Sequence, residues 1–149
     1  AYANTIAAHA PMATAIADGA ESRRDYMDES GGRYVQVIAD GGMGDSGSFI
    51  KAFALGADAV MLGSPLARAE EAPGKGMLWA AEAREQTLPR GFRTNVGTVG
   101  TLEDIMFGPS HNADGTTNYI GALRRAMATT GYVDLKSFQR CPVTVAPTR

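Results

Sequence analysis

Two short apolar runs, each ending in a glycine-containing turn, constrain this chain more than any other feature. The first is VQVIADGGMG at residues 35–44, and the second is AVMLGS at residues 59–64. The segment between them is long enough for one helix, which predicts a β-α-β unit with two parallel strands. Both turns should then lie at the carboxyl ends of neighbouring strands, where α/β sheets bind their ligands.

The two turns contain Asp40, Gly41, Gly42, Gly63 and Ser64. Glycine lets backbone N–H groups approach an anion closely, and neighbouring turns of this kind can hold a phosphate group. The residues alone leave a second interpretation open, in which the aspartate is a turn residue or a helix cap and the glycines only permit tight turns.

Hydrophobic periodicity and turn residues predict the other elements. We expect helices from Pro11 to about Ser30, from Asp45 or Ser46 to about Leu55, and over residues 78–85, 102–107, 119–130 and 134–140. We expect strands over residues 34–39, 59–62, 92–96 and 143–145, the first of them continuously buried. Residues 1–10 carry no clear pattern, and residues 108–117 are typical of a loop.

Composition excludes several classes of function. The net charge is −2 and the basic residues are scattered, which argues against a nucleic-acid or acidic-membrane partner. No apolar run approaches the ~20 residues that span a bilayer. The one cysteine, Cys141, favours a reducing, cytoplasmic setting. With only His9 and His111 beside it as soft ligands, we expect no zinc site.

Chain length limits the architecture. The two apolar runs begin about 25 residues apart, and an eight-stranded α/β barrel typically takes about 250 residues. A chain of 149 residues with two clear barrel strands cannot close such a barrel alone. We therefore expect an α/β fold that is the end of a larger unit.

Several stretches of the chain together resemble one protein family. They are IADGG at 38–42, ALGADAVMLGSPLA at 54–67, EAPG at 71–74, LPRG at 88–91, VGTVGTLEDIMFGPS at 96–110, GALRRAMATTGY at 121–132 and DLKSFQR at 134–140. This combination resembles the IMP dehydrogenase / GMP reductase family, in particular the bacterial branch that lacks CBS regulatory domains. The similarity runs from about Pro11 to Val145.

The resemblance implies a fold and a division of the chain. Residues 11–64 correspond to the seventh and eighth βα units of a (β/α)8 TIM barrel, so the chain would be its C-terminal portion. Residues 1–10 are an unmatched lead-in, residues 65–116 a flap-like irregular region, and residues 117–149 the C-terminal helices and tail. The family forms tetramers and octamers, which implies a homo-oligomer.

The resemblance also implies roles for the glycine turns. The family's aspartate at the end of the seventh strand binds the ribose hydroxyls of the nucleotide, and Asp40 matches it. Gly42, after Gly41, matches the residue whose backbone N–H binds the 5′-phosphate, and Gly63 and Ser64 complete that cradle. These roles suit the residue types, because a carboxylate can accept hydrogen bonds from two neighbouring hydroxyls.

The implied activity is oxidation of IMP by NAD⁺ and water to XMP and NADH, a step of guanine nucleotide biosynthesis, with K⁺ as a further cofactor. GMP reductase, which converts GMP to IMP and ammonia with NADPH, is the alternative. The family's nucleophilic cysteine precedes the position of Ala1, and GMLWAA at 76–81 does not match the Arg-Tyr segment of the flap. We therefore assign no catalytic residue. Two other functions stay open: a non-catalytic nucleotide-binding or assembly module, and an FMN-dependent barrel oxidoreductase.

Overall fold

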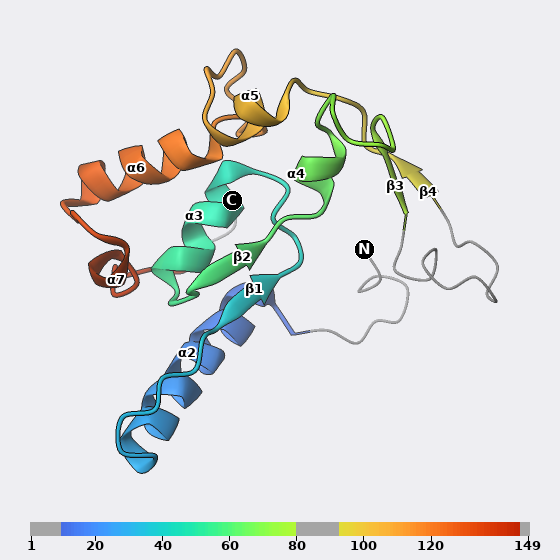
Figure 1. The fold of residues 1–149 in the computed structure, drawn as a ribbon. Helices are drawn as coiled ribbons and strands as arrows, with labels where there is room; N and C mark the ends of the chain where they lie inside the picture. The colour runs from blue at the N-terminus through green and yellow to red at the C-terminus, as the bar shows by residue number, and fades with distance from the viewer. Residues whose placement is uncertain (1–9, 80–92, 147–149) are drawn as a thin grey trace, which may run out of the picture.

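The computed structural model describes residues 10–79 and 93–146. A long helix, α2 (Met12–Glu29), leads into a β-α-β unit, which is followed by a short helix, an antiparallel strand pair and three further helices (Figure 1). The other elements are β1 (Ile38–Asp40), α3 (Ser46–Ala54), β2 (Ala59–Met61), α4 (Ser64–Ala67), β3 (Met77–Trp79), β4 (Arg93–Asn95), α5 (Leu102–Met106), α6 (Tyr119–Thr130) and α7 (Leu135–Phe138).

The predicted β-α-β unit is present. Strands β1 and β2 pair in parallel, with Ile38 opposite Ala59 and Asp40 opposite Met61. Helix α3 connects them, as a parallel pair requires. Gly56 ends this connection with a φ of 109°, the left-handed conformation that glycine favours just past a helix. The unit thus places both glycine turns at one edge of the strand pair.

Helix α3 lies at the centre of the molecule because two of its faces are apolar. Phe49 and Phe53 belong to a core cluster shared with α5, α6 and α7, and their rings meet edge-on with centroids 5.1 Å apart. Ala52 on another face packs in a second cluster with Ile16 of α2 and Ala39 of β1. The helix therefore joins the strand pair to the C-terminal helices.

The C-terminal helices begin at capping side chains, of which the sequence predicted only Asp134. Thr101 and Asp104 form a reciprocal capping box at α5, and Asn118 accepts a hydrogen bond from the Gly121 N–H at the start of α6. Asp134 caps α7 through the Ser137 N–H. The predicted bounds of these three helices agree with the observed bounds to within two residues at each end.

The first strand differs from its prediction. Instead of a continuously buried strand over 34–39, β1 has three residues, and Tyr34, Val35 and Ile38 are exposed. Side chains alternate between the faces of a strand. Ala39 is buried against the helices, whereas the face that carries Ile38 and Asp40 is uncovered in the described part of the chain.

Three further predictions need correction or stay outside the structure. Residues 77–79 form strand β3, antiparallel to β4, instead of the start of a helix over 78–85, because Met77–Trp79 pairs with Arg93–Asn95. Residues 143–145 form no strand, and the short helix α4 was not predicted. Residues 80–85 and most of the lead-in lie outside the described residues. No helix in the described ranges is long and apolar enough to cross a membrane.

Candidate functional site

The register of the parallel strands brings the two glycine turns together. Asp40, the last residue of β1, lies opposite Met61, the last residue of β2. Gly42 follows Asp40 by two residues, and Gly63 follows Met61 by two residues. Asp40, Gly41, Gly42, Gly63 and Ser64 therefore occupy the carboxyl edge of one strand pair, as the sequence predicted.

The backbone of the first turn needs glycine. Gly41 and Gly42 have φ values of 113° and 73°, in the left-handed range that a side chain disfavours. A Cβ at Gly41 would lie 3.3 Å from the Met12 side chain, while Gly42 and Gly63 face open space. A 150 Å³ cavity beside Gly41 and Gly42 is lined by the apolar start of α2 and by α3. It does not include Asp40, Gly63 or Ser64.

The cap of helix α3 shows that Asp40 does not serve as a helix cap. The N-cap of α3 is Asp45, whose carboxylate accepts a 2.8 Å hydrogen bond from the Ser48 N–H. The Ser46 N–H donates to the carbonyl of Gly115 at 2.8 Å. Asp40 is therefore not a helix cap, and its exposed carboxylate has no hydrogen bond to another described residue. Gly63, in contrast, precedes α4 without any side-chain cap.

Helix α6 fixes the position of the glycine turn. The hydroxyl of Tyr119 donates to the carbonyl oxygen of Met43, 3.4 Å away, and the Tyr119 side chain is fully buried. Its ring meets Phe49 edge-on at 5.3 Å. Burial, with a smaller effect from Asp45, raises the pKa of Tyr119 to about 12, so the phenol stays neutral and keeps donating. No local sequence pattern predicts this contact, because it joins residues 76 positions apart.

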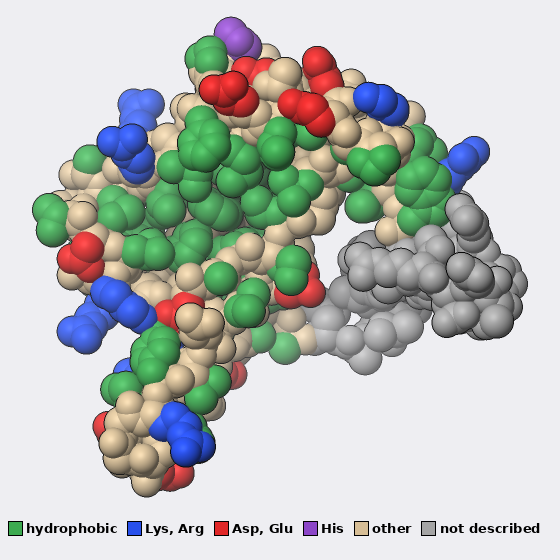
Figure 2. All heavy atoms as spheres, in the orientation of Figure 1, with side chains coloured by type: hydrophobic (Ala, Val, Ile, Leu, Met, Phe, Trp, Pro, Cys, Tyr) green, Lys and Arg blue, Asp and Glu red, His purple; other side chains and the backbone are tan. Residues whose placement is uncertain are grey.

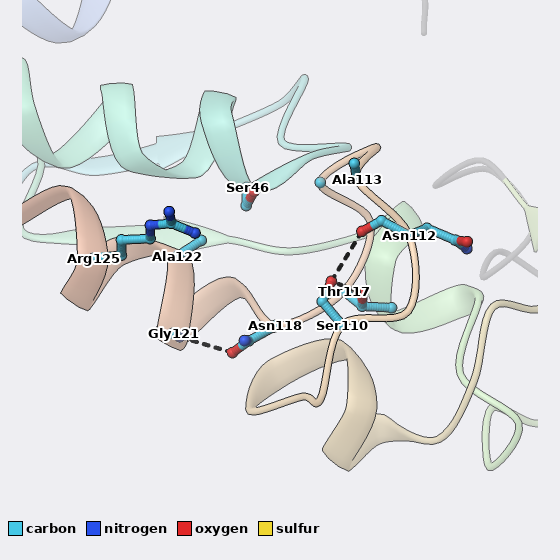
Figure 3. A pocket seen from close by; sticks show the side chains of 10 residues that line it. Ser46, Ser110, Asn112, Ala113, Thr117, Asn118, Gly121, Ala122 and Arg125 are labelled. Carbon is cyan, nitrogen blue, oxygen red and sulfur yellow. Dashed lines mark hydrogen bonds between the residues drawn. The ribbon is translucent and has the colours of Figure 1, made fainter.

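A separate polar hollow of about 380 Å³ lies between α3, α6 and the loop over 108–118 (Figure 3). Its polar groups largely satisfy one another. Ser110 and Thr117 share a 2.7 Å hydrogen bond between their hydroxyls, and Asn118 caps α6. Arg125 is its only cationic lining residue. The loop is held at the start of α3 by the hydrogen bond from the Ser46 N–H to the Gly115 carbonyl.

One cluster of charged residues was not foreseen. Asp58, just before β2, accepts hydrogen bonds from Arg23 at 2.5 Å, Lys136 at 2.9 Å, the Val37 N–H at 2.9 Å and Tyr34. Burial raises the pKa of Asp58, but hydrogen bonds from Tyr34, the Val37 N–H, Lys136 and Gln139 outweigh it and hold the pKa well below its ordinary value. The partners lie up to 81 residues away, so no local pattern reveals them.

Neither the cysteine nor the described histidine belongs to the glycine turns. Cys141 packs partly buried against the core beside α7, and His111 is exposed in the loop over 108–118. His9 lies outside the described residues. No three His, Cys, Asp or Glu side chains gather as potential metal ligands within residues 10–79 and 93–146.

Comparison with known proteins identifies the family. The family model described as "IMP dehydrogenase / GMP reductase domain" matches residues 4–93. The chain belongs to this family. That membership confirms the resemblance drawn from IADGG and the stretches after it, and it favours the nucleotide oxidoreductase over the FMN-dependent alternative.

Relatives within the family extend the match. An uncharacterized oxidoreductase of Mycobacterium leprae is 54% identical over 138 residues, which cover 91% of this chain and 37% of the relative. An inosine-5′-monophosphate dehydrogenase of Thermoplasma acidophilum is 47% identical over 92 residues, 62% of this chain and 16% of the relative. The chain thus spans little more than a third of the mycobacterial relative that it matches.

A solved structure has the same fold. The crystal structure of an IMP dehydrogenase/GMP reductase-like protein from Corynebacterium glutamicum superposes with a TM-score of 0.87 at 52% identity. The superposition covers 97% of this chain and 39% of that protein. The fold is therefore that of the IMP dehydrogenase-like TIM-barrel family, and the chain is an oxidoreductase-family member.

Proposed function

We propose that this chain is the C-terminal part of an IMP dehydrogenase-type barrel and supplies its site for the ribose and phosphate of a purine nucleotide. Asp40 would bind the ribose hydroxyls, and backbone N–H groups of Gly42, Gly63 and Ser64 would bind the 5′-phosphate, with Gly41 allowing the turn. The single observation that carries this proposal is the register of the strands. It sets Asp40 opposite Met61, and these residues precede Gly42 and Gly63 by two positions each.

The chemistry of this edge supports a nucleotide. The exposed carboxylate has no partner among the described residues, so it is free to accept hydrogen bonds from two vicinal hydroxyls. The backbone before α4 has no side-chain cap, which leaves N–H groups for a phosphate. The cap at α3, by contrast, is a carboxylate that would repel an anion there, so we place the phosphate at the glycines.

The uncovered strand face supports the placement in a barrel. Ile38 and Met61 are more than half exposed although both are apolar. In a closed barrel, one face of every strand points to the interior and the other to the helices. The helices cover the Ala39 face of the pair, so the uncovered face would point to the interior, closed by the six remaining strands of the barrel.

The activity that this site would serve is oxidation of IMP to XMP by NAD⁺, in the cytoplasm. GMP reductase with NADPH is the alternative, because the chain has no match to the Arg-Tyr segment that activates water. The family resemblance implies a homo-oligomer in both cases. The nucleotide-binding residues are the same in each case.

Turnover by the full protein tests the proposal. We expect NADH and XMP to form when it is given IMP and NAD⁺. Oxidation of NADPH in the presence of GMP, without that activity, would show the reductase instead. Binding of IMP with neither reaction would make the chain a nucleotide-binding module, and failure to bind either nucleotide would contradict the proposal.

A further inference from the structure

A basic hollow lies at the other end of the strands from the glycine turns. It has a volume of about 520 Å³ and lies between the second half of α2 and helix α7. Blue side chains gather where α7 lies above α2 (Figure 2). Asp58, which anchors its wall, directly precedes β2, whereas Gly63 follows β2. The hollow is therefore at the amino ends of the strands.

Four cations line this hollow, and no carboxylate does. They are Arg23 and Arg24 of α2, Lys136 of α7, and Arg140 just beyond α7. Asp58 behind the wall neutralises one of these charges, which leaves an excess of three positive charges in a chain whose net charge is −2. Within the described ranges, Arg24 and Arg140 have no carboxylate within 4.0 Å.

Two of the cations are held in place before any ligand arrives. Arg23 donates to Asp58 at 2.5 Å and to the Gly56 carbonyl at 3.1 Å, and its side chain is only 10% exposed. Lys136 lies over the ring of Tyr34, with its Nζ 4.2 Å from the ring centroid. Such fixed groups lose little conformational freedom when a ligand binds.

We propose that this hollow binds a small anion that carries two or more phosphate groups. Its volume is in the range of small-molecule sites, and guanidinium groups match phosphate oxygens with paired hydrogen bonds. An acidic peptide would need a larger surface than a hollow between two helices. Arg24 and Arg140 would make the direct contacts, and Arg23 and Lys136 would supply the fixed positive wall.

Calorimetric titration of the full chain with tripolyphosphate at physiological salt tests the proposal. We expect saturable binding of one anion per chain. The double variant Arg24→Gln/Arg140→Gln should weaken it at least tenfold, because it removes the two free charges and leaves the Asp58 contacts intact. The thermal midpoint of this variant, unchanged within a few degrees, would show that it is folded.

The control is Arg124→Gln/Arg125→Gln on α6, which removes the same charge from another exposed face. This control should bind tripolyphosphate within twofold of the wild-type affinity. Saturating IMP and the substitution Asp40→Ala should likewise leave that affinity unchanged, because the nucleotide turns lie at the opposite end of the strands. The proposal would be overturned if tripolyphosphate did not bind, if IMP displaced it, or if both double variants lost the same affinity for it. It would also be overturned if an oligoglutamate of matched charge bound with equal affinity. These results do not depend on whether the chain turns over IMP.

Discussion

The hydroxyl of Tyr119 donates a hydrogen bond to the backbone carbonyl oxygen of Met43, the residue directly after Gly42. This contact joins residues 76 positions apart and is the point where helix α6 holds the glycine turn. The C-terminal helices contribute no residue to the candidate site, but they support it through this contact. Their packing against α3 sets the position of the turn that follows β1.

Removing the Tyr119 hydroxyl should loosen this turn. We expect Tyr119→Phe to lower the free energy of unfolding by about 1 kcal/mol, since the buried carbonyl loses its partner while the ring packing stays. The matched control is Tyr26→Phe, whose side chain is 39% exposed and should change stability by less than about 0.5 kcal/mol. Urea denaturation measures both. Equal effects would mean that the Tyr119 contact contributes nothing specific.

The Asp58 cluster should make stability depend on acid. The folded pKa lies below the ordinary value of 3.8, so the contribution of Asp58 is complete above about pH 4 and is lost as the pH falls through the lower folded pKa. At pH 7, Asp58→Asn should cost about 3 kcal/mol, because Arg23 stays buried without its charge partner.

Urea denaturation at pH 7 and at pH 3 checks this prediction. The difference between wild type and Asp58→Asn should shrink in part at pH 3, because the carboxyl of the unfolded chain is then largely protonated while the folded carboxylate is still ionised. Asp28→Asn on the exposed surface of α2 is the control and should show little difference at either pH. A gap for Asp58→Asn that is unchanged between the two pH values would contradict the account.

Two glycine substitutions separate backbone strain from ligand binding. Gly42→Ala should cost about 1 kcal/mol or more of stability, because alanine disfavours a φ of 73°. Gly63→Ala should cost less than about 0.5 kcal/mol, since its φ is −107° and a Cβ there meets nothing within 4 Å. Both should weaken IMP binding if the phosphate lies against these backbones. Wild-type IMP affinity in Gly63→Ala would exclude Gly63 from the phosphate site.

Local sequence signals predicted the elements on which the site is built. The two apolar runs, their glycine turns and the helix-length segment between them together predicted the β-α-β unit, because each signal acts within a few residues. Asp45 and Asp134 predicted helix starts for the same reason, since a capping carboxylate bonds to N–H groups three residues away.

What the sequence could not predict depends on distant partners. An apolar run such as residues 34–39 indicates burial, but whether it is buried depends on which segment covers it. Trp79 pairs with Arg93 across an intervening segment, so a local helical pattern over 78–85 was misleading. The Asp58 cluster and the Tyr119 contact join residues far apart in the chain, and only the folded structure brings them together.

Binding of IMP to the full protein and to Asp40→Ala tests the central claim most directly. By calorimetric titration we expect saturable binding to the wild type and affinity at least about 100-fold weaker in the variant, because it loses two hydrogen bonds to a charged group. Asp18→Ala, on the exposed surface of α2, should bind like the wild type. Equal affinity of Asp40→Ala and wild type would contradict the placement of the nucleotide at this edge of the strands.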